Sequence, residues 1–228
     1  MDKLYESFRL LSSMDKELFQ ILGVTLRMSF FSTSISCILG IPAGILLGKS
    51  RFRGRNLIKK IINTLMGLPP VVAGLLVYFL FTRYGPLGEL RLLYTVTVMV
   101  IAQVILITPV VIALTSSIIG VNASRITETA KGMGLSKGRI FRLLLGENKV
   151  PLLSVVLTAF GRSIAEVGAV SLVGGNIQWK TRVMTTAILL ETNKGNFSFA
   201  LALGIILLIL ALIVNILASL LVKEKNDD

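Results

Sequence analysis

The sequence contains no histidine and a single cysteine, and only 16% of its 228 residues are charged. The absence of histidine excludes imidazole-based acid–base catalysis and histidine-ligated metal sites. Cys37 lies in an apolar stretch and has no second cysteine with which to form an intramolecular disulfide. We therefore predict no catalytic residue and no metal site in this chain.

Apolar residues are abundant instead. They make up 54% of the sequence, and the mean hydropathy of +0.80 lies far outside the range of soluble domains. These values predict an all-α integral membrane protein, because long apolar runs cross a bilayer as helices. The net charge of +12 comes from short basic blocks beside the apolar runs, without the interleaved aromatics of a nucleic-acid surface. We therefore expect contacts with membrane lipid and none with nucleic acid.

Five apolar segments are long enough to cross a hydrocarbon core of roughly 30 Å at about 1.5 Å per residue. They lie at residues 28–47, 61–81, 92–119, 152–173 and 197–222. Basic residues concentrate in the loops after the first and third spans, which predicts that these loops are cytoplasmic. The chain is then a multi-pass protein of the cytoplasmic (inner) membrane, with its N-terminus outside and its C-terminus inside. No repeat or long linker divides residues 23–228, so we treat them as one domain.

Residues 1–22 form a separate segment in this prediction. Apolar side chains such as Leu11, Leu18 and Leu22 recur there at near-helical spacing. This pattern predicts an amphipathic helix at the membrane interface. It is not typical of a signal peptide, because Asp2 and Asp15 interrupt the basic start and apolar core that such a peptide needs.

Several residues within the spans are unusual for a bilayer. Adjacent Pro69 and Pro70 remove two backbone donors, which predicts either a packing kink or a broken helix beside a transport pathway. Arg162 and Glu166 are four residues apart, so on one helix they share a face and can pair. This intramembrane charge indicates either a functional site or a structural ion pair. Gln103 is predicted to hold helices together.

The loop after the fourth span carries two cations. A Gly-Gly-Asn turn ends at Asn176, and Lys180 and Arg182 flank Thr181. In water this would be an ordinary solvated loop. Near the mouth of a pore the two cations would attract an anion.

Segment 122–151 is a polar, basic island between two spans. Asn122 or Ser124 is a suitable N-cap for a short helix that Gly134 can end in a left-handed turn, and Ser136 can cap a second helix. A short helix across the entry to a span fits a groove on a soluble partner. The alternative is an inside loop that only sets topology.

Residues 43–50 fit a permissive phosphate-loop pattern that ends in Lys49 and Ser50. A phosphate loop joins a strand to a helix in a soluble fold, whereas this segment ends a membrane span. We therefore expect that this chain binds no cofactor and that any ATP is held by a partner.

Glu128, Thr129 and Ala130, followed after three residues by Gly134, resemble the cytoplasmic loop signature of ABC importer permeases, Glu-Ala-Ala, three residues, Gly. Thr129 departs from the usual first Ala, and Gly-Glu at 146–147 replaces the usual Leu-Pro. In that family the loop is the coupling helix, which docks on the ATPase subunit. The resemblance assigns coupling to Ser124, Arg125, Glu128, Thr129, Ala130 and Gly134.

The stretch at 160–169, Asn176 and the Lys-Thr-Arg of 180–182 are similar to the fourth-span signature of molybdate, tungstate and sulfate permeases. Val167 replaces the usual Phe, and Trp179 stands where Gly is common. More than half the chain resembles the tungstate-type permeases most closely. The residues predicted for the translocation pathway are Pro69, Pro70, Arg162, Glu166, Gly168, Asn176, Lys180, Thr181 and Arg182.

The resemblance implies a type I (MetI-like) permease arrangement for residues 23–228 and an importer of tungstate, or alternatively of molybdate or sulfate. It also implies a homodimer of this chain, two ABC ATPase subunits that use ATP and Mg, and an extracytoplasmic oxyanion-binding protein. The chain itself would not be an enzyme. Two other classes remain open. An ion-gradient-driven secondary transporter would need coupling carboxylates, of which only Glu166 is available. A membrane scaffold would need only five spans and a docking loop.

Overall fold

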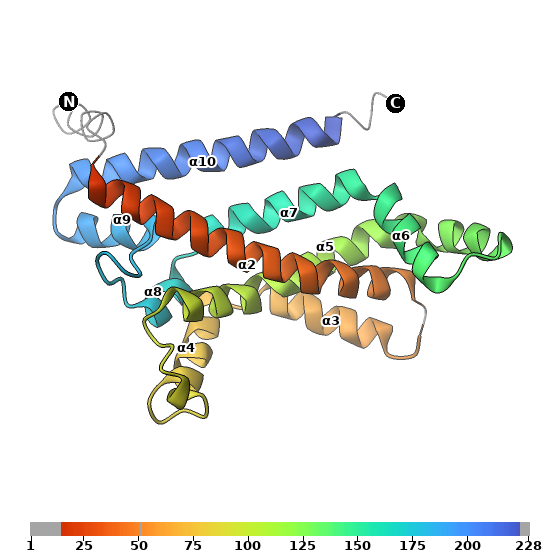
Figure 1. Cartoon of the computed structure of the whole chain (residues 1–228), viewed down its shortest axis with the longest axis horizontal. Helices are drawn as coiled ribbons and strands as arrows, with labels where there is room; N and C mark the ends of the chain where they lie inside the picture. The colour runs from red at the N-terminus through yellow and green to blue at the C-terminus, as the bar shows by residue number, and fades with distance from the viewer. Residues whose placement is uncertain (1–14, 51, 224–228) are drawn as a thin grey trace.

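The computed structural model describes residues 15–50 and 52–223, and within these ranges the regular elements are helices without a β-strand (Figure 1). The all-α prediction is confirmed there. The helices are α2 (Lys16–Lys49), α3 (Arg55–Met66), α4 (Pro70–Phe81), α5 (Val96–Gly132), α6 (Lys137–Glu147), α7 (Lys149–Ile164), α8 (Gly168–Gly174), α9 (Met184–Asn193) and α10 (Phe197–Lys223), with one 3-10 turn, η1 (Gly88–Leu90).

Helices α2, α5, α7 and α10 run along the long axis of the molecule, while α4 leaves this bundle at an angle (Figure 1). The two ends of the bundle are named here by the helices that form them. The α8–α9 end comprises residues 174–196 with the first turn of α2, and the α5–α6 end comprises residues 124–147 with Lys49 and Ser50. They lie at opposite ends of the long axis (Figure 1).

The most extensive helix pair is α2 with α5. A Cβ added at Gly44 would stand 2.5 Å from Cβ of Thr115, and one at Gly40 would stand 2.7 Å from Cγ1 of Val111. Glycines four residues apart share one face of a helix. They allow the two backbones to approach closely, as small residues do between membrane helices.

Gln103 joins three helices, as predicted. Its Oε1 accepts hydrogen bonds from the hydroxyls of Ser32 at 2.6 Å and Ser163 at 2.8 Å, and its Nε2 donates to the carbonyl of Ser163 at 2.8 Å. All three residues are fully buried, on α5, α2 and α7. The network satisfies polar groups at a depth where an unpaired one would be costly.

Three helices are long and apolar enough to cross a membrane alone, namely α2, α5 and, over Phe197–Leu217, α10. Two further pairs qualify only together, because each is bent at a short break: α3 with α4 by 94° and α6 with α7 by 72°. Counting each bent pair as one span gives up to five candidate spans, the number that the sequence predicts, but the pair α6 and α7 then covers 137–164 and not the predicted 152–173.

The predicted second span, 61–81, is broken rather than continuous. Helix α3 ends at Met66, Pro69 is extended with φ −60° and ψ 127°, and Pro70 is the first residue of α4. A first-turn proline is tolerated because its missing N–H has no partner inside the helix. The Pro69–Pro70 pair therefore produces a break and not a kink.

The predicted fourth span, 152–173, is also interrupted, and the expected ion pair within it is wrong. Helix α7 ends at Ile164, so Arg162 and Glu166 do not share one helical face. Among the described residues, no ion pair includes either side chain. Instead, Oε1 of Glu166 accepts a hydrogen bond from the N–H of Ala169 at 3.1 Å, in the first turn of α8. The first N–H groups of a helix need acceptors from outside that helix, and at the start of α8 the carboxylate of Glu166 is one such acceptor.

The predicted interfacial helix lies partly outside the described residues, which exclude positions 1–14. Its remainder, 16–22, forms the first turns of α2, with Asp15 as the N-cap through its Oδ1. Leu18 and Ile21 are buried in a cluster with residues of α9 and α10. This part differs from the prediction in being the start of the helix that contains the first span and not a separate helix. Only one face of it is buried, since Lys16 and Phe19 are exposed.

Candidate functional site

Helix α5 continues through the residues assigned to coupling. Asn122 and Ser124, expected as N-caps of a separate short helix, lie inside α5, which extends without a break to Gly132. The sequence after Pro109 offers no proline to end the helix before that point. The predicted coupling helix is therefore the last turns of a long helix, and the expected caps are wrong.

The turn that ends α5 is as predicted. Gly134 has a φ of +70°. Its N–H donates to the carbonyl of Lys131 at 2.9 Å, and the N–H of Leu135 donates to the carbonyl of Ala130 at 3.0 Å. This is the Schellman arrangement, in which a left-handed glycine lets the last carbonyls of a helix find donors. Helix α6 follows, with Ser136 at its N-cap position as expected but without a capping hydrogen bond from its side chain.

The residues assigned to coupling divide into one buried and several exposed side chains. Ala130 is buried in an apolar cluster with Ile45 of α2, Ile119 of α5 and Ile140 of α6. This cluster fixes the α5–α6 hairpin against α2. The exposed members are Ser124, Arg125, Glu128, Thr129 and Gly134. They are the ones available to a partner.

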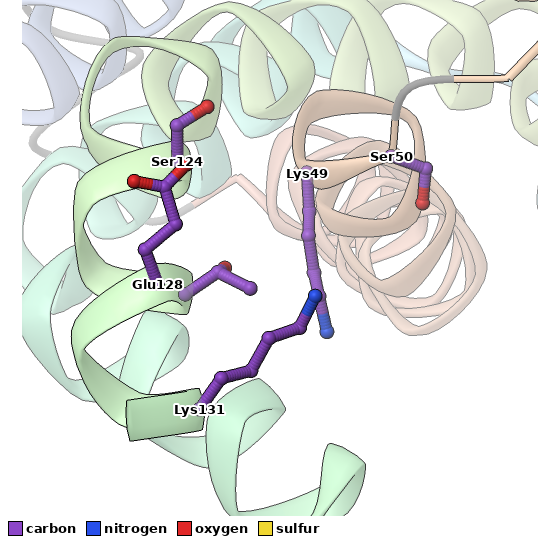
Figure 2. A pocket seen from close by; sticks show the side chains of 6 residues that line it. Lys49, Ser50, Ser124, Glu128 and Lys131 are labelled. Atoms are coloured by element: carbon purple, nitrogen blue, oxygen red, sulfur yellow. The ribbon is translucent and has the colours of Figure 1, made fainter. Parts of the chain in front are cut away.

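Two hollows flank the last turns of α5. The larger, here called the polar pocket, has a volume of about 440 Å³ and is lined by Lys49, Ser50, Ser124, Thr127, Glu128 and Lys131 (Figure 2). The smaller, of about 190 Å³, is lined by Arg125, Ile126, Thr129, Ala130, Met133, Leu143 and Glu147. Because residues three and four apart share a helix face, the end of α5 offers one polar and one mostly apolar surface.

Sequence reasoning missed the polar pocket. It considered Lys49 only as a topology signal and as part of a rejected phosphate-loop pattern, and it gave Thr127 and Lys131 no role. The spacing of Thr127, Glu128 and Lys131 places them on one face of a helix, so this half of the pocket had a readable signal. The contribution of Lys49 could not be predicted from the sequence, because it depends on the packing of α2 against α5.

The two helix breaks lie against each other. A Cβ added at Gly168 would stand 2.8 Å from Cγ2 of Val71 and 3.6 Å from Cβ of Pro70, and one at Gly74 would stand 2.6 Å from Cα of Ala169. The start of α8 therefore packs closely on the start of α4. The predicted pathway residues gathered near this contact are Pro69, Pro70, Glu166 and Gly168.

Two predicted pathway residues of the α8–α9 end are used for internal hydrogen bonds. Oδ1 of Asn176 accepts from the hydroxyl of Thr186 at 2.9 Å. The hydroxyl of Thr181 donates to the carbonyl of Gly174 at 2.6 Å and accepts from the N–H of Ile177 at 3.0 Å. These bonds fix the shape of the loop.

Arg182 is part of an internal ion pair. Its Nη1 lies 2.8 Å from Oε1 of Glu17, with side-chain exposures of 10% and 27%. Lys180, by contrast, is exposed. The two cations therefore differ in their surroundings, because Glu17 supplies a counter-charge to Arg182 and Lys180 forms no ion pair with a described residue. Sequence reasoning missed Glu17 because it assigned residues 1–22 to an interfacial helix.

Comparison with known proteins gives a consistent result. Residues 40–226 match the family model of the binding-protein-dependent transport system inner membrane component. The chain is 39% identical to the tungstate uptake system permease protein TupB of Peptoclostridium acidaminophilum, over 98% of this chain and 100% of that protein. It is 36% identical to TupB of Campylobacter jejuni, over 94% and 92% of the two chains. Identity to the sulfate transport system permease protein CysT of Escherichia coli is 27%, over 83% and 71%.

Among solved structures, the fold matches a chain of the inward-facing methionine ABC transporter MetNI. The TM-score is 0.75 at 17% identity, and the match covers 93% of this chain and 97% of that one. At this identity the match shows the fold alone. It confirms the expected type I (MetI-like) arrangement of helices.

Proposed function

The chain belongs to the family of binding-protein-dependent transport system inner membrane components, and from this premise we propose that it is the permease subunit of an ATP-driven importer of tungstate. It is a multi-pass protein of the inner membrane. Membership in this family replaces both alternatives from other classes, the secondary transporter and the scaffold, because neither is a component of a binding-protein-dependent transport system.

The substrate proposal is supported by the two TupB relatives, whose printed names state tungstate uptake and whose identities of 39% and 36% extend over nearly the whole chain. The sulfate permease is more distant at 27%. Tungstate is therefore proposed ahead of sulfate. Molybdate stays the alternative on chemical grounds, since the two oxyanions have nearly the same size and charge.

The observation that carries the importer mechanism is the Gly134 turn. The turn joins α5 to α6, buried Ala130 packs the last turns of α5 against α2 and α6, and Glu128 is exposed. A fixed hairpin with exposed polar side chains is suited to docking on a soluble subunit. In the proposal this subunit is the ABC ATPase, which binds ATP and Mg and performs the hydrolysis, while the present chain is not catalytic and holds no cofactor.

Arg162 supports a pathway formed by two copies of the chain. It is exposed near the end of α7 and pairs with no other described residue. A cation at membrane depth is unfavourable against lipid. We place this surface of α7 toward a water-containing pathway between two permease copies, with the α4–α8 contact beside it.

In the proposed cycle the α5–α6 end faces the cytoplasm and the N-terminus lies outside. Two ATPase subunits close on ATP and draw the two α5–α6 hairpins together, which opens the pathway to a loaded extracytoplasmic binding protein. After hydrolysis the pathway faces inward. Most of the selectivity rests with the binding protein, because a permease that held a strongly hydrated dianion tightly would not release it.

Uptake into proteoliposomes tests the proposal. The vesicles contain this chain and its ATPase subunit, with the oxyanion-binding protein outside and ATP inside or omitted. We expect ATP-dependent uptake of labelled tungstate that unlabelled molybdate competes with strongly and sulfate weakly. Uptake of sulfate in preference to tungstate would overturn the substrate, and ATP-independent uptake from an assembled complex would overturn the importer mechanism.

A further inference from the structure

The polar pocket contains two lysines that form no ion pair within the described chain. Lys49, at the end of α2, and Lys131, near the end of α5, extend toward each other across the pocket (Figure 2). Neither forms an ion pair with any residue in 15–50 or 52–223. Two ammonium groups directed into one cavity repel each other, and an anionic group between them would be stabilised by both.

The pocket also carries a negative group, which narrows the choice of ligand. The side chain of Glu128 turns toward Ser124 and away from the two lysine ammonium groups (Figure 2). A small inorganic dianion would be attracted by the lysines and repelled by this carboxylate. A protein surface can present an acid to the lysines and a donor to Glu128. The volume of about 440 Å³ also suits a side chain with its surroundings better than a single ion.

We propose that the polar pocket receives an aspartate or glutamate side chain of the partner ATPase subunit, whose carboxylate binds between Lys49 and Lys131. This inference rests on the proposed function, because it takes the ATPase as the occupant. The pocket shares Ser124 and Glu128 with the residues assigned to coupling. It thus adds the end of α2 to a docking surface that would otherwise consist of α5 and α6 alone.

The first test measures binding of the purified ATPase subunit to the full-length permease in nanodiscs of purely zwitterionic lipid, across a series of salt concentrations. We expect the variant Lys49→Gln/Lys131→Gln to bind about tenfold more weakly and with a smaller salt dependence. The variant Lys49→Arg/Lys131→Arg should bind within a few-fold of wild type. The matched control Lys59→Gln/Lys60→Gln removes the same charge from two residues of α3 that do not line the pocket, and it should bind like wild type.

The second test uses a water-soluble carbodiimide, which activates a carboxylate so that an amine in contact with it forms an amide and displaces the urea. Mass spectrometry of the treated complex should find a peptide that joins Lys49 or Lys131 to an acidic residue of the ATPase subunit. Cross-links from both lysines only to residues of the permease itself would overturn the proposal.

The possible outcomes distinguish a failure of the proposed function from a failure of the pocket assignment. Failure of the wild-type permease to bind the ATPase subunit would overturn the proposed function. Normal wild-type binding with an unchanged affinity of the Lys49→Gln/Lys131→Gln variant would overturn only the assignment of the pocket. An effect that appears only when anionic phospholipid is added would assign the pocket to a lipid phosphate and would also overturn the inference.

Discussion

The two ends of the bundle differ in how their charges are balanced. At the α8–α9 end, the buried guanidinium of Arg182 is paired with Glu17 at 2.8 Å. At the α5–α6 end, Lys49 and Lys131 face a cavity and pair with no residue that the structure describes. Both ends read alike in the sequence, as basic loops beside spans. The difference teaches that a cation indicates a binding site only where the chain itself supplies no counter-charge.

The same contrast holds for uncharged groups. The side chains of Thr181 and Asn176 form their hydrogen bonds within the α8–α9 end. At the α5–α6 end Met133 is 73% exposed, and the Oγ1 of Thr127 has no partner among the described residues, although the same holds for Nε of Arg182 at the α8–α9 end. Thr181 and Asn176 are thus bonded within the chain, whereas in the proposed function the α5–α6 end receives a partner. We therefore expect substitutions at the first end to lower stability and substitutions at the second to lower coupled transport.

The largest effect on stability is expected for Arg182→Gln. Removal of the guanidinium leaves the half-buried Glu17 carboxylate with only its hydrogen bond from Nε2 of Gln178, which should lower the free energy of unfolding by about 2 kcal/mol. Chemical unfolding in detergent micelles measures it. Glu17→Gln should cost a similar amount, and the double variant less than the sum of the two. A loss below about 0.5 kcal/mol for Arg182→Gln would show that the pair behaves like a solvated surface contact.

Gly134→Val should act at the opposite end and mainly on coupling. A β-branched residue at a φ of +70° strains the turn by about 1 to 2 kcal/mol. We expect tungstate uptake to fall about tenfold, the factor that 1.4 kcal/mol represents, while the ATPase continues to hydrolyse ATP. The control is Gly132→Ala, since an added Cβ there meets nothing within 4 Å. Wild-type uptake by Gly134→Val in an assembled complex would contradict the coupling role of the turn.

A pH-dependent effect is expected at the α8–α9 end from Glu191. Burial raises the pKa of this carboxyl, but hydrogen bonds from Lys194 and Asn196 lower it more, so that its pKa lies below the usual 4.5. Because the folded pKa is below the unfolded one, the ionised group stabilises the fold above about pH 4.5, and this contribution is lost as the pH falls through the folded pKa. The melting temperature of wild type should therefore approach that of Glu191→Gln on acidification. A constant difference between the two proteins would contradict the assignment.

The smallest effect is expected for Lys180→Gln. This side chain is exposed, so the free energy of unfolding should change by less than about 0.5 kcal/mol. If Lys180 attracts the anion toward the pathway, uptake should fall by a few-fold at low salt and recover at high salt, where a single exposed charge is screened. Lys180→Arg is the matched control. Unchanged uptake at every salt concentration would remove Lys180 from the predicted pathway.

The features that could be predicted from the sequence depend on composition or on short-range geometry. The apolar runs predict an all-helical membrane protein. The left-handed turn at Gly134 is predictable because this backbone conformation favours glycine. Gln103 is predictable as a bridge because an amide inside a membrane span needs partners. The break before Pro70 follows from the missing donors of two adjacent prolines.

The features that could not be predicted depend on contacts between distant segments. Arg182 and Glu17 are 165 positions apart, and no local pattern joins them. The end of α7 before Glu166 could not be predicted, because no proline marks it in the sequence. The Glu166 carboxylate accepts a hydrogen bond at the start of α8 and does not pair with Arg162. The expected i,i+4 pair requires one continuous helix, and α7 ends between these two residues. The unpredicted polar pocket likewise arises only where α2 packs against α5.

Hydrogen exchange of the permease with and without its ATPase subunit tests the central claim most directly, namely that the end with unbalanced charges is the docking end. The account predicts slower exchange on ATPase binding within residues 124–147 and at the end of α2 near Lys49, with no change within 174–186. Protection confined to residues 174–186, with none within 124–147, would contradict it.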